Sequence, residues 1–327
     1  MEQMTPSHNV GLDLVRVTET TALASGPWIG AGNVTEAHIA ATYAMKAALD
    51  SLDMKGTVVI GEERETQGER PLGAGTAVGS GFGAEVDVLV DPIDGTSLLS
   101  AGRRGAISVV ALAPKGSIWS PHPAVYMEKI VVDQEAAAAL VPECMNAPAA
   151  WVLALIARVK KKSVADLAVV ILDRPRHAAL IDEIRAAGAR ILLRDDGDTE
   201  GAMVAATMDS DADVLMGIGG AAQGVLSACA VKALGGAMLA RLAPQSSAER
   251  DTIRAAGLDE RRIYQCDDLV QSNEIFFAAT AITQSYLLSP LRMQSGFART
   301  HSLLLRTETG TRRFIRAEHR LFAAPLD

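Results

Sequence analysis

Apolar and polar positions along the first half of the chain predict two helices followed by strands. Apolar residues recur at helical spacing over residues 12–24 and again over 35–52, which favours two amphipathic helices. The segments GTVVIGEE and EVDVLVD are typical of short buried strands, and each ends in carboxylates. Two further strand candidates follow, AISVVALAP and YMEKIVVD. This half of the chain therefore predicts a mixed sheet covered by helices.

The pattern changes beyond residue 149, where strands and helices alternate. LAVVILDRPRHAALIDEIRAAGARILLRDDGDTEGAMVAAT alternates strand, helix, strand and helix, and ADVLMGIGG is a strand that leads into another helical segment. Such alternation is typical of a mainly parallel sheet. We therefore expect an α/β protein with two domains, an N-terminal α+β domain over residues 1–145 and a C-terminal α/β domain over residues 146–327.

Composition and charge exclude several classes of protein. The 327 residues are 49% hydrophobic and can bury a substantial core, and the formal net charge of −8 gives no general attraction to nucleic acid. No apolar run approaches the roughly 18 residues that span a membrane, and the N-terminus lacks a signal-peptide pattern, so we expect a cytoplasmic protein without membrane contact. The three cysteines are far apart, which argues against a disulfide framework or a zinc site.

The stretch VLVDPIDGTSLL, residues 88–99, carries the strongest candidate chemistry. Its proline sets a turn, so that Asp91 and Asp94 can converge on one point instead of alternating across the strand. Gly95 allows a ligand to approach the backbone closely. Thr96 offers a hydroxyl and an N-cap position at the start of a short helix, a place that suits a phosphate.

Further acids follow the preceding strand of the chain, at Glu62 and Glu63. Together with Asp91 and Asp94 they make an oxygen-only cluster of the kind that holds Mg²⁺ or Mn²⁺. Such a centre lowers the pKa of a bound water and polarises a phosphoryl group, so the chemistry indicated is metal-assisted hydrolysis. The alternative is that these acids only cap a turn and keep the strand ends soluble.

GEE followed some thirty residues later by DPIDGT resembles the lithium-sensitive, magnesium-dependent phosphatase superfamily. Several later segments look specifically like the class II fructose-1,6-bisphosphatases of bacteria, and the resemblance runs from about Leu12 to His319. It implies a layered α-β-α-β-α sugar phosphatase fold and a phosphoric monoester hydrolase of carbohydrate metabolism and gluconeogenesis. The expected substrate is a phosphorylated sugar such as fructose 1,6-bisphosphate, and the expected assembly is a homodimer or homotetramer. The later segments are YMEKI, ILDRPRH, DDGD, ADVLMGIGGAAQGVLSACAVKALGG and THSLLLRTETGTRRFIRAEHR.

The resemblance also assigns roles to individual residues. It implies a metal-binding and catalytic N-terminal domain and a sugar-phosphate-binding C-terminal domain. The implied metal ligands are Glu62, Glu63, Asp91 and Asp94, and the implied catalytic residues are Thr96, Asp91 and Glu63. The implied substrate-binding residues are Asp94, Gly95, Thr96, Tyr126, Arg174, Arg176, Asp196, Asp198 and Gly220. Forked arginine donors suit phosphate oxygens, and paired acids suit sugar hydroxyls.

Two amides depart from the family pattern. Asn33 stands where the family has a metal-binding aspartate, and Gln223 stands where it has a glutamate that can hold another metal. Amide oxygens still contact hard cations, but the loss of two negative charges predicts fewer or weaker metal positions. The segment TAITQSYLL departs as well, at Ala281, Ser285 and Tyr286. Two alternatives therefore stay open: a diverged paralogue acting on another sugar phosphate or sugar nucleotide, or a catalytically impaired binding protein.

Overall fold

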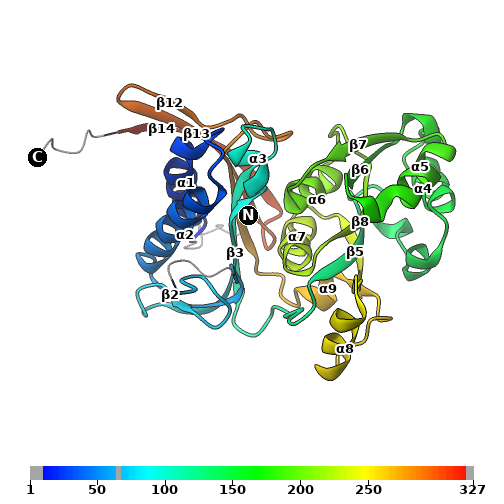
Figure 1. The fold of residues 1–327 in the computed structure, drawn as a ribbon, viewed down its shortest axis with the longest axis horizontal. Helices are drawn as coiled ribbons and strands as arrows, with labels where there is room; N and C mark the ends of the chain where they lie inside the picture. Colours follow the sequence, from blue (N-terminus) through cyan, green and yellow to red (C-terminus); the bar gives the residue numbers. More distant parts are fainter. Residues whose placement is uncertain (1–9, 64–67, 322–327) are drawn as a thin grey trace, which may run out of the picture.

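The computed structural model describes residues 10–63 and 68–321, and it contains two β-sheets (Figure 1). The first sheet has eight strands in this part of the chain: β1 Met54–Ile60, β2 Ala77–Val78, β3 Ala84–Asp94, β4 Ile107–Pro114, β11 Phe276–Ala281, β12 Arg292–Gln294, β13 Phe297–Arg306 and β14 Thr311–Arg320. Their order is β12-β13-β11-β4-β3-β1-β2, and β14 pairs with β13. β1 and β3 are parallel and the other neighbours are antiparallel, so the mixed sheet predicted for the first half is confirmed.

The second sheet is also mixed, and fewer of its strand pairs are parallel than in the mainly parallel sheet expected there. Its described strands are β5 Tyr126–Val132, β6 Ala168–Leu172, β7 Arg190–Arg194, β8 Val214–Gly220, β9 Ala237–Leu242 and β10 Tyr264–Gln265. Their order is β10-β9-β5-β8-β6-β7. Only the β8/β6 and β6/β7 pairs are parallel. The reason is that β5, which comes from the first half of the chain, lies between β8 and β9 and runs antiparallel to both.

Helices cover the two sheets and also separate them (Figure 1). From the outer face of the first sheet to the outer face of the second, the pairs are α1 Gly11–Ser25 with α2 Val34–Asp50, α6 Asp198–Ala206 with α7 Ala221–Ala233, and α4 Ala149–Val159 with α5 Ala178–Ala186. The α/β class and the layered α-β-α-β-α order are therefore confirmed. Shorter elements are α3 Thr96–Ser100, α8 Ser247–Ala255 and α9 Cys266–Leu269, with 3₁₀ turns η1 Gly26–Trp28, η2 Ala137–Ala139, η3 Pro142–Asn146, η4 Val164–Asp166 and η5 Pro175–His177.

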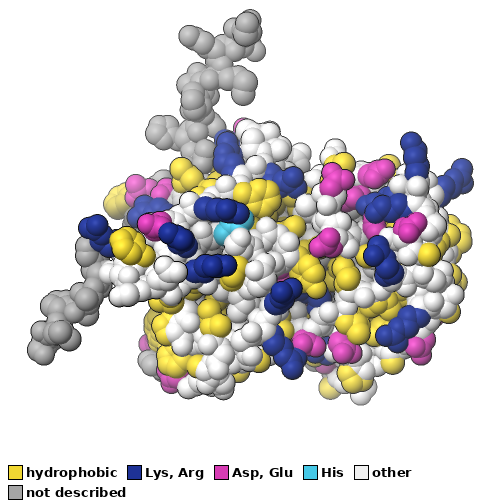
Figure 2. Space-filling view, turned by 90° about the horizontal axis from the view of Figure 1, so that it is seen from above, with side chains coloured by type: hydrophobic (Ala, Val, Ile, Leu, Met, Phe, Trp, Pro, Cys, Tyr) yellow, Lys and Arg dark blue, Asp and Glu magenta, His cyan; other side chains and the backbone are white. Residues whose placement is uncertain are grey.

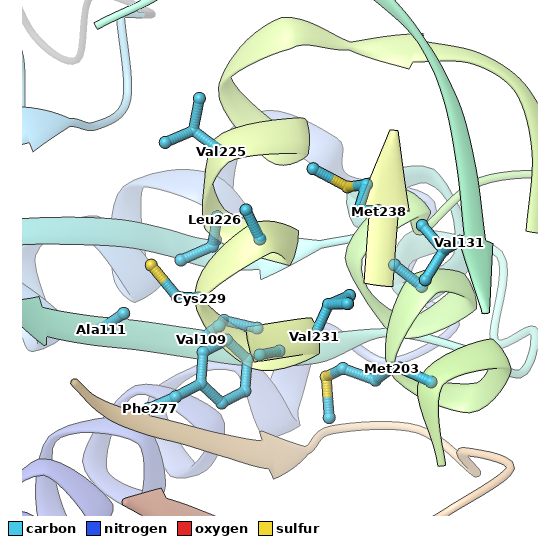
Figure 3. Packing of buried hydrophobic residues seen from close by; sticks show 14 of the residues in the cluster. Val109, Ala111, Val131, Met203, Val225, Leu226, Cys229, Val231, Met238 and Phe277 are labelled. Atoms are coloured by element: carbon cyan, nitrogen blue, oxygen red, sulfur yellow. The ribbon is translucent and has the colours of Figure 1, made fainter. Parts of the chain in front are cut away.

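The central helices join the two sheets into one hydrophobic core. All nine residues of α6 are buried, as are eight consecutive residues of α7, because a helix between two sheets has no solvent-facing side. Figure 3 shows Cys229 of α7 beside Val109 and Phe277 of the first sheet, with Val131 and Met238 of the second sheet beyond the helix. The sheets are thus packed against a shared apolar layer.

The two sheets cross the predicted domain boundary at residue 145. β5 precedes that position but belongs to the second sheet, and β11 to β14 return to the first sheet. The division into domains 1–145 and 146–327 stays a prediction. Within the described residues all three cysteines are free, and no helix is long and apolar enough to cross a membrane.

Candidate active site

A cavity of about 370 Å³ lies where strands of both sheets end. Crevices outside the carboxyl ends of strands are common ligand sites in α/β proteins. The residues that line the cavity are Glu62, Asp91, Ile93, Asp94, Gly95, Thr96, Tyr126, Leu172, Arg174, Arg176, Asp196, Asp198, Gly219, Gly220 and Gln223. The structure therefore brings together all of the predicted site residues except Asn33 and Glu63.

The turn after β3 places the DPIDGT motif at the cavity. The register of β3 against β4 shifts between Asp91 and Asp94, so the strand is irregular there. Gly95 follows with φ of +87°, a left-handed conformation that favours glycine, and it is the N-cap of α3. The N-cap role expected for Thr96 is therefore wrong. Thr96 is the first residue of the helix, and its hydroxyl donates to the backbone carbonyl of Ile93 at 3.0 Å.

Parallel pairing of β1 and β3 brings three carboxylates to one edge of the first sheet. Because the two strands run in the same direction, Glu62, which follows β1, lies near Asp91 and Asp94 at the end of β3. Nδ1 of the buried His38, on α2, lies 3.6 Å from Oε2 of Glu62. This side of the cavity is thus dominated by acidic oxygens.

The surroundings raise the pKa of both aspartates. Burial and then the charge of Glu62 raise the pKa of Asp91 to about 7, although a hydrogen bond from Gln223 opposes the shift. Burial and then the charges of Asp91, Asp196 and other acids raise the pKa of Asp94 well above its ordinary value. Negative charge is therefore unfavourable here unless a cation offsets it.

Tyr126 and two arginines line the cavity from elements of the second sheet. Arg174 and Arg176 flank the proline of η5, directly after β6. Arg176 donates from Nε and Nη2 to the carbonyl of Ile218 at 3.2 and 2.9 Å, and its guanidinium lies 5.0 Å from the centroid of the Tyr126 ring. Arg174 lies 4.0 Å from Asp196 and is partly exposed. Both guanidiniums have donors left for an anionic ligand.

The segment from the end of β7 to the start of α6 contributes two aspartates that other elements hold in place. Oδ2 of Asp196 accepts a hydrogen bond from Oγ of Ser97 on α3 at 2.6 Å, which ties this segment to the DPIDGT turn. Asp198 is buried, and its Oδ2 lies 2.5 Å from Nζ of Lys129 on β5. A Cβ at Gly219 would lie 2.1 Å from the same oxygen, so glycine is needed for this close approach.

The three remaining predicted residues lie differently. Gln223 is in the cavity, where its Nε2 donates to Oδ2 of Asp91 at 3.3 Å. Asn33 is outside the cavity lining, because its Oδ1 caps α2 by accepting from the backbone N–H of Glu36 at 3.1 Å. Glu63 also lies outside it: its Oε1 accepts from the backbone N–H of Ala74 at 3.0 Å. The metal and catalytic roles of these residues stay predictions.

The donor chemistry nevertheless fits a hard divalent cation. In the described ranges, no group of three or more His, Cys, Asp or Glu side chains is already arranged to hold a metal ion. Yet Glu62, Asp91 and Asp94 offer the carboxylate oxygens that such cations prefer. Their burial and mutual repulsion raise the aspartate pKa values. A cation would relieve that repulsion, so these three residues are suited to hold it.

Sequence reasoning missed two buried side chains that support the cavity. Lys129 forms the ion pair with Asp198 described above. Its position as a charged residue within the apolar strand YMEKIVV could have indicated this supporting role. The backbone N–H of Glu200 on α6 donates to Oδ2 of Asp94 at 3.2 Å, while its carboxylate accepts from Arg194 and from the backbone N–H of Tyr286. An acid that follows Asp198 within the small-residue helix 198–206 was the signal for Glu200. Conversely, His177 bonds to the backbone through both ring nitrogens, which agrees with a structural role.

Gly95→Ala is expected to lower the free energy of unfolding by about 2–3 kcal/mol and to reduce activity. The substitution strains a left-handed residue, and the new Cβ would lie 3.1 Å from Leu98 and 3.3 Å from the carbonyl of Gly105. Gly116→Ala is the matched control, since Gly116 has φ of +78° and no atom within 4 Å. It should cost only about 1 kcal/mol in urea unfolding. Equal losses for the two variants would contradict this account of the turn.

The sequence matches one protein family along almost its whole length. Residues 8–319 match the family described as "Bacterial fructose-1,6-bisphosphatase, glpX-encoded". The chain therefore belongs to this family of metal-dependent phosphatases, and the predicted resemblance is confirmed.

Similar proteins of bacteria bear related names. The chain is 37% identical to "Fructose-1,6-bisphosphatase class 2" of Haemophilus influenzae over 325 residues, which cover 95% of this chain and 96% of that protein. It is 38% identical to "Fructose-1,6-bisphosphatase 2 class 2" of Escherichia coli over 305 residues, with 89% and 94% covered. It is 35% identical to "Fructose-1,6-bisphosphatase 1 class 2" of the same organism, with 95% of each chain covered.

Proposed function

We propose that this protein is a phosphoric monoester hydrolase that removes a phosphate from fructose 1,6-bisphosphate, with Mg²⁺ or Mn²⁺ as its cofactor. One observation carries the proposal: the carboxylates Glu62, Asp91 and Asp94 and the guanidiniums of Arg174 and Arg176 line a single cavity. A substrate with two phosphates can therefore place one near the acids and one near the arginines. Family membership and the names of the similar proteins support the choice of substrate.

At the acidic end, the chain positions the phosphate that is attacked. Glu62, Asp91 and Asp94 would hold the cation, which would lower the pKa of a bound water and polarise the phosphoryl group. The Thr96 hydroxyl donates a hydrogen bond to the carbonyl of Ile93, so its oxygen can accept a hydrogen bond from the attacking water and orient it. Gly95, which lacks a side chain, allows the phosphoryl group to approach the backbone. The metal and catalytic role proposed for Glu63 is supported only by its position in the GEE motif.

At the other end, the chain binds the sugar and the second phosphate. Arg174 and Arg176 present forked donors to phosphate oxygens, and the ring of Tyr126 makes a cation–π contact with the guanidinium of Arg176. Asp196 and Asp198 accept hydrogen bonds from sugar hydroxyls, and Gly220 leaves room for the ring. We further propose that the protein works in carbohydrate metabolism in the cytoplasm, as a homodimer or homotetramer.

The test is phosphate release from a panel of sugar phosphates with each metal added in turn to chelated protein. We expect release to require Mg²⁺ or Mn²⁺, and kcat/KM for fructose 1,6-bisphosphate to exceed that for fructose 6-phosphate by about tenfold or more, because only the bisphosphate reaches both ends of the cavity. A clear preference for another sugar phosphate or a sugar nucleotide would identify a diverged paralogue. Ligand binding without release under any metal would identify a binding protein.

A further inference from the structure

A second cavity, of about 530 Å³, lies on the part of the first sheet formed by β12, β13 and β14. It shares no lining residue with the candidate active site. Four of its side chains carry or can carry positive charge, namely Arg292, Arg299, His301 and Arg316, and one is acidic, Glu318. We call it the basic cavity. Its content of arginine contrasts with the net charge of −8 of the whole chain.

Strand register explains why these side chains gather on one face. Arg292 of β12 pairs with Arg299 of β13, which pairs with Glu318 of β14. His301 and Arg316 form the next row, two residues further along their strands. Because side chains alternate across a strand with a period of two, both rows lie on the same face of the sheet. The face is therefore built by regular pairing and not by mobile loops.

Like charges in this face are only partly compensated. Arg292 lies directly opposite Arg299, an arrangement that destabilises a sheet when nothing offsets the repulsion. Glu318 pairs with Arg299 at 2.8 Å, whereas the structure assigns no acidic partner to Arg292 or Arg316 among the described residues. Figure 2 shows Lys and Arg side chains gathered around a histidine on the face of the molecule that β12, β13 and β14 occupy. An anion bound between the arginines would remove the repulsion.

The histidine of the cavity is fixed in a form that can donate to an anion. Nδ1 of His301 accepts a hydrogen bond from the backbone N–H of Ser289 at 2.9 Å. The neutral ring therefore carries its proton on Nε2. The basic cavity thus combines three guanidiniums with one imidazole donor, and Ser289 and Pro290 add a wall beside them.

We propose that the basic cavity is a second anion site, which binds a small molecule that carries two phosphoryl groups. Its volume is in the range of about 300–1,000 Å³ that is typical of small-molecule sites. Forked arginine donors are suited to phosphate oxygens. The arginines are distributed over three neighbouring strands, which lie about 4.8 Å apart in a sheet, so together they extend over about 10 Å across the sheet. One phosphate contacts only part of this width, whereas two phosphoryl groups can contact arginines of all three strands.

The experiment measures the binding of inorganic pyrophosphate and of inorganic phosphate by calorimetry in the presence of a chelator. The protein carries Arg174→Gln and Arg176→Gln, which remove binding at the candidate active site. We expect one pyrophosphate site per chain, with phosphate bound about tenfold more weakly. Adding Arg292→Gln and Arg316→Gln should weaken pyrophosphate binding by about tenfold or more, because two charge-assisted contacts are lost. In the otherwise unchanged protein, the same pair should leave kcat for phosphate release intact, which shows that the variant folds.

Arg313→Gln with Arg320→Gln is the matched control. Both residues lie on β14 and the change removes the same charge, but neither residue lines the basic cavity. We expect this pair to weaken pyrophosphate binding by less than about twofold, the size of a general charge effect. Equal weakening by the two pairs would show only non-specific attraction, and no pyrophosphate binding in the Arg174 and Arg176 variant would overturn the site. Equal affinity for phosphate and pyrophosphate would overturn the requirement for two phosphoryl groups. None of these outcomes depends on whether the protein is a phosphatase.

Discussion

Asp91→Asn is expected to reduce kcat for phosphate release by about a thousandfold or more, equivalent to about 4 kcal/mol of transition-state stabilisation. The amide keeps the shape of the side chain but removes the negative charge that, with Glu62 and Asp94, would hold the cation, and the cation would offset the charge that develops on the leaving oxygen. Gln223, which donates to Asp91, is an uncharged amide and cannot replace the lost charge. Phosphate release at saturating Mg²⁺ or Mn²⁺ measures the effect.

Asp195→Asn is the control for Asp91→Asn. The chemical change is the same at Asp195, which directly follows β7, but this residue is exposed, pairs with Arg103 at 2.5 Å and does not line the cavity. We expect it to change kcat by less than about twofold, because exposed ion pairs contribute little. If Asp91→Asn keeps activity within about tenfold of the unchanged protein, Asp91 is not a ligand of the catalytic cation.

Local patterns predicted much of the fold and most of the cavity. The two opening helices lie where their apolar spacing placed them, at Gly11–Ser25 and Val34–Asp50. The strands ending in GEE and DPIDGT were visible because each is an apolar run that stops at carboxylates. Their parallel pairing was not visible, yet it is what brings Glu62 beside Asp91. Motif residues were therefore easier to predict than the contacts between them.

Long-range pairing accounts for the largest difference between the predicted and the observed fold. β8, α7 and β9 follow the strand, helix, strand pattern of a parallel unit, and the strand β8 and the helix α7 were predicted from the sequence. β5 then occupies the place between β8 and β9, with Tyr126 opposite Gly220 and Met127 opposite Leu242. Nothing within YMEKIVV indicates which strands it will join, since pairing depends on residues 82 to 115 positions further along the chain. Two of the three antiparallel pairs of the second sheet result from this single insertion, and the third is β9 with β10.

Competing local contacts explain the site residues that lie outside the cavity. Adjacent residues in an extended segment point to opposite sides, so GEE delivers Glu62 to the cavity and turns Glu63 towards Ala74. Asn33 precedes a helix, where an amide oxygen readily accepts from the backbone N–H three residues on. Lys129 and Glu200 were missed for the opposite reason: they act on Asp198 and Asp94 across elements that are distant in sequence.

The metal-free protein is expected to lose stability as the pH rises from about 4 to about 7, by about 4 kcal/mol for Asp91 alone. Burial and Glu62 raise the folded pKa of Asp91 from 3.8 to about 7. Between these values the folded protein keeps a proton that the unfolded chain releases, so the stabilisation present at low pH disappears as the pH increases. The raised pKa of Asp94 adds a loss in the same direction. Urea unfolding in the presence of a chelator, measured at several pH values, tests this.

Asp91→Asn and added metal should remove the pH effect in two independent ways. The variant has no carboxylate at this position, so its free energy of unfolding should depend less on pH and exceed that of the unchanged metal-free protein at pH 8. Mg²⁺ or Mn²⁺ at pH 8 should raise the Tm of the unchanged protein, because a ligand of the folded state stabilises it by mass action, and should raise the Tm of the variant much less. Identical pH profiles for the two proteins, or equal responses to metal, would mean that Asp91 is neither repelled by its neighbours nor bound to the cation. If the unchanged protein has low activity but is stabilised by the metal, the cation binds at this site without supporting hydrolysis.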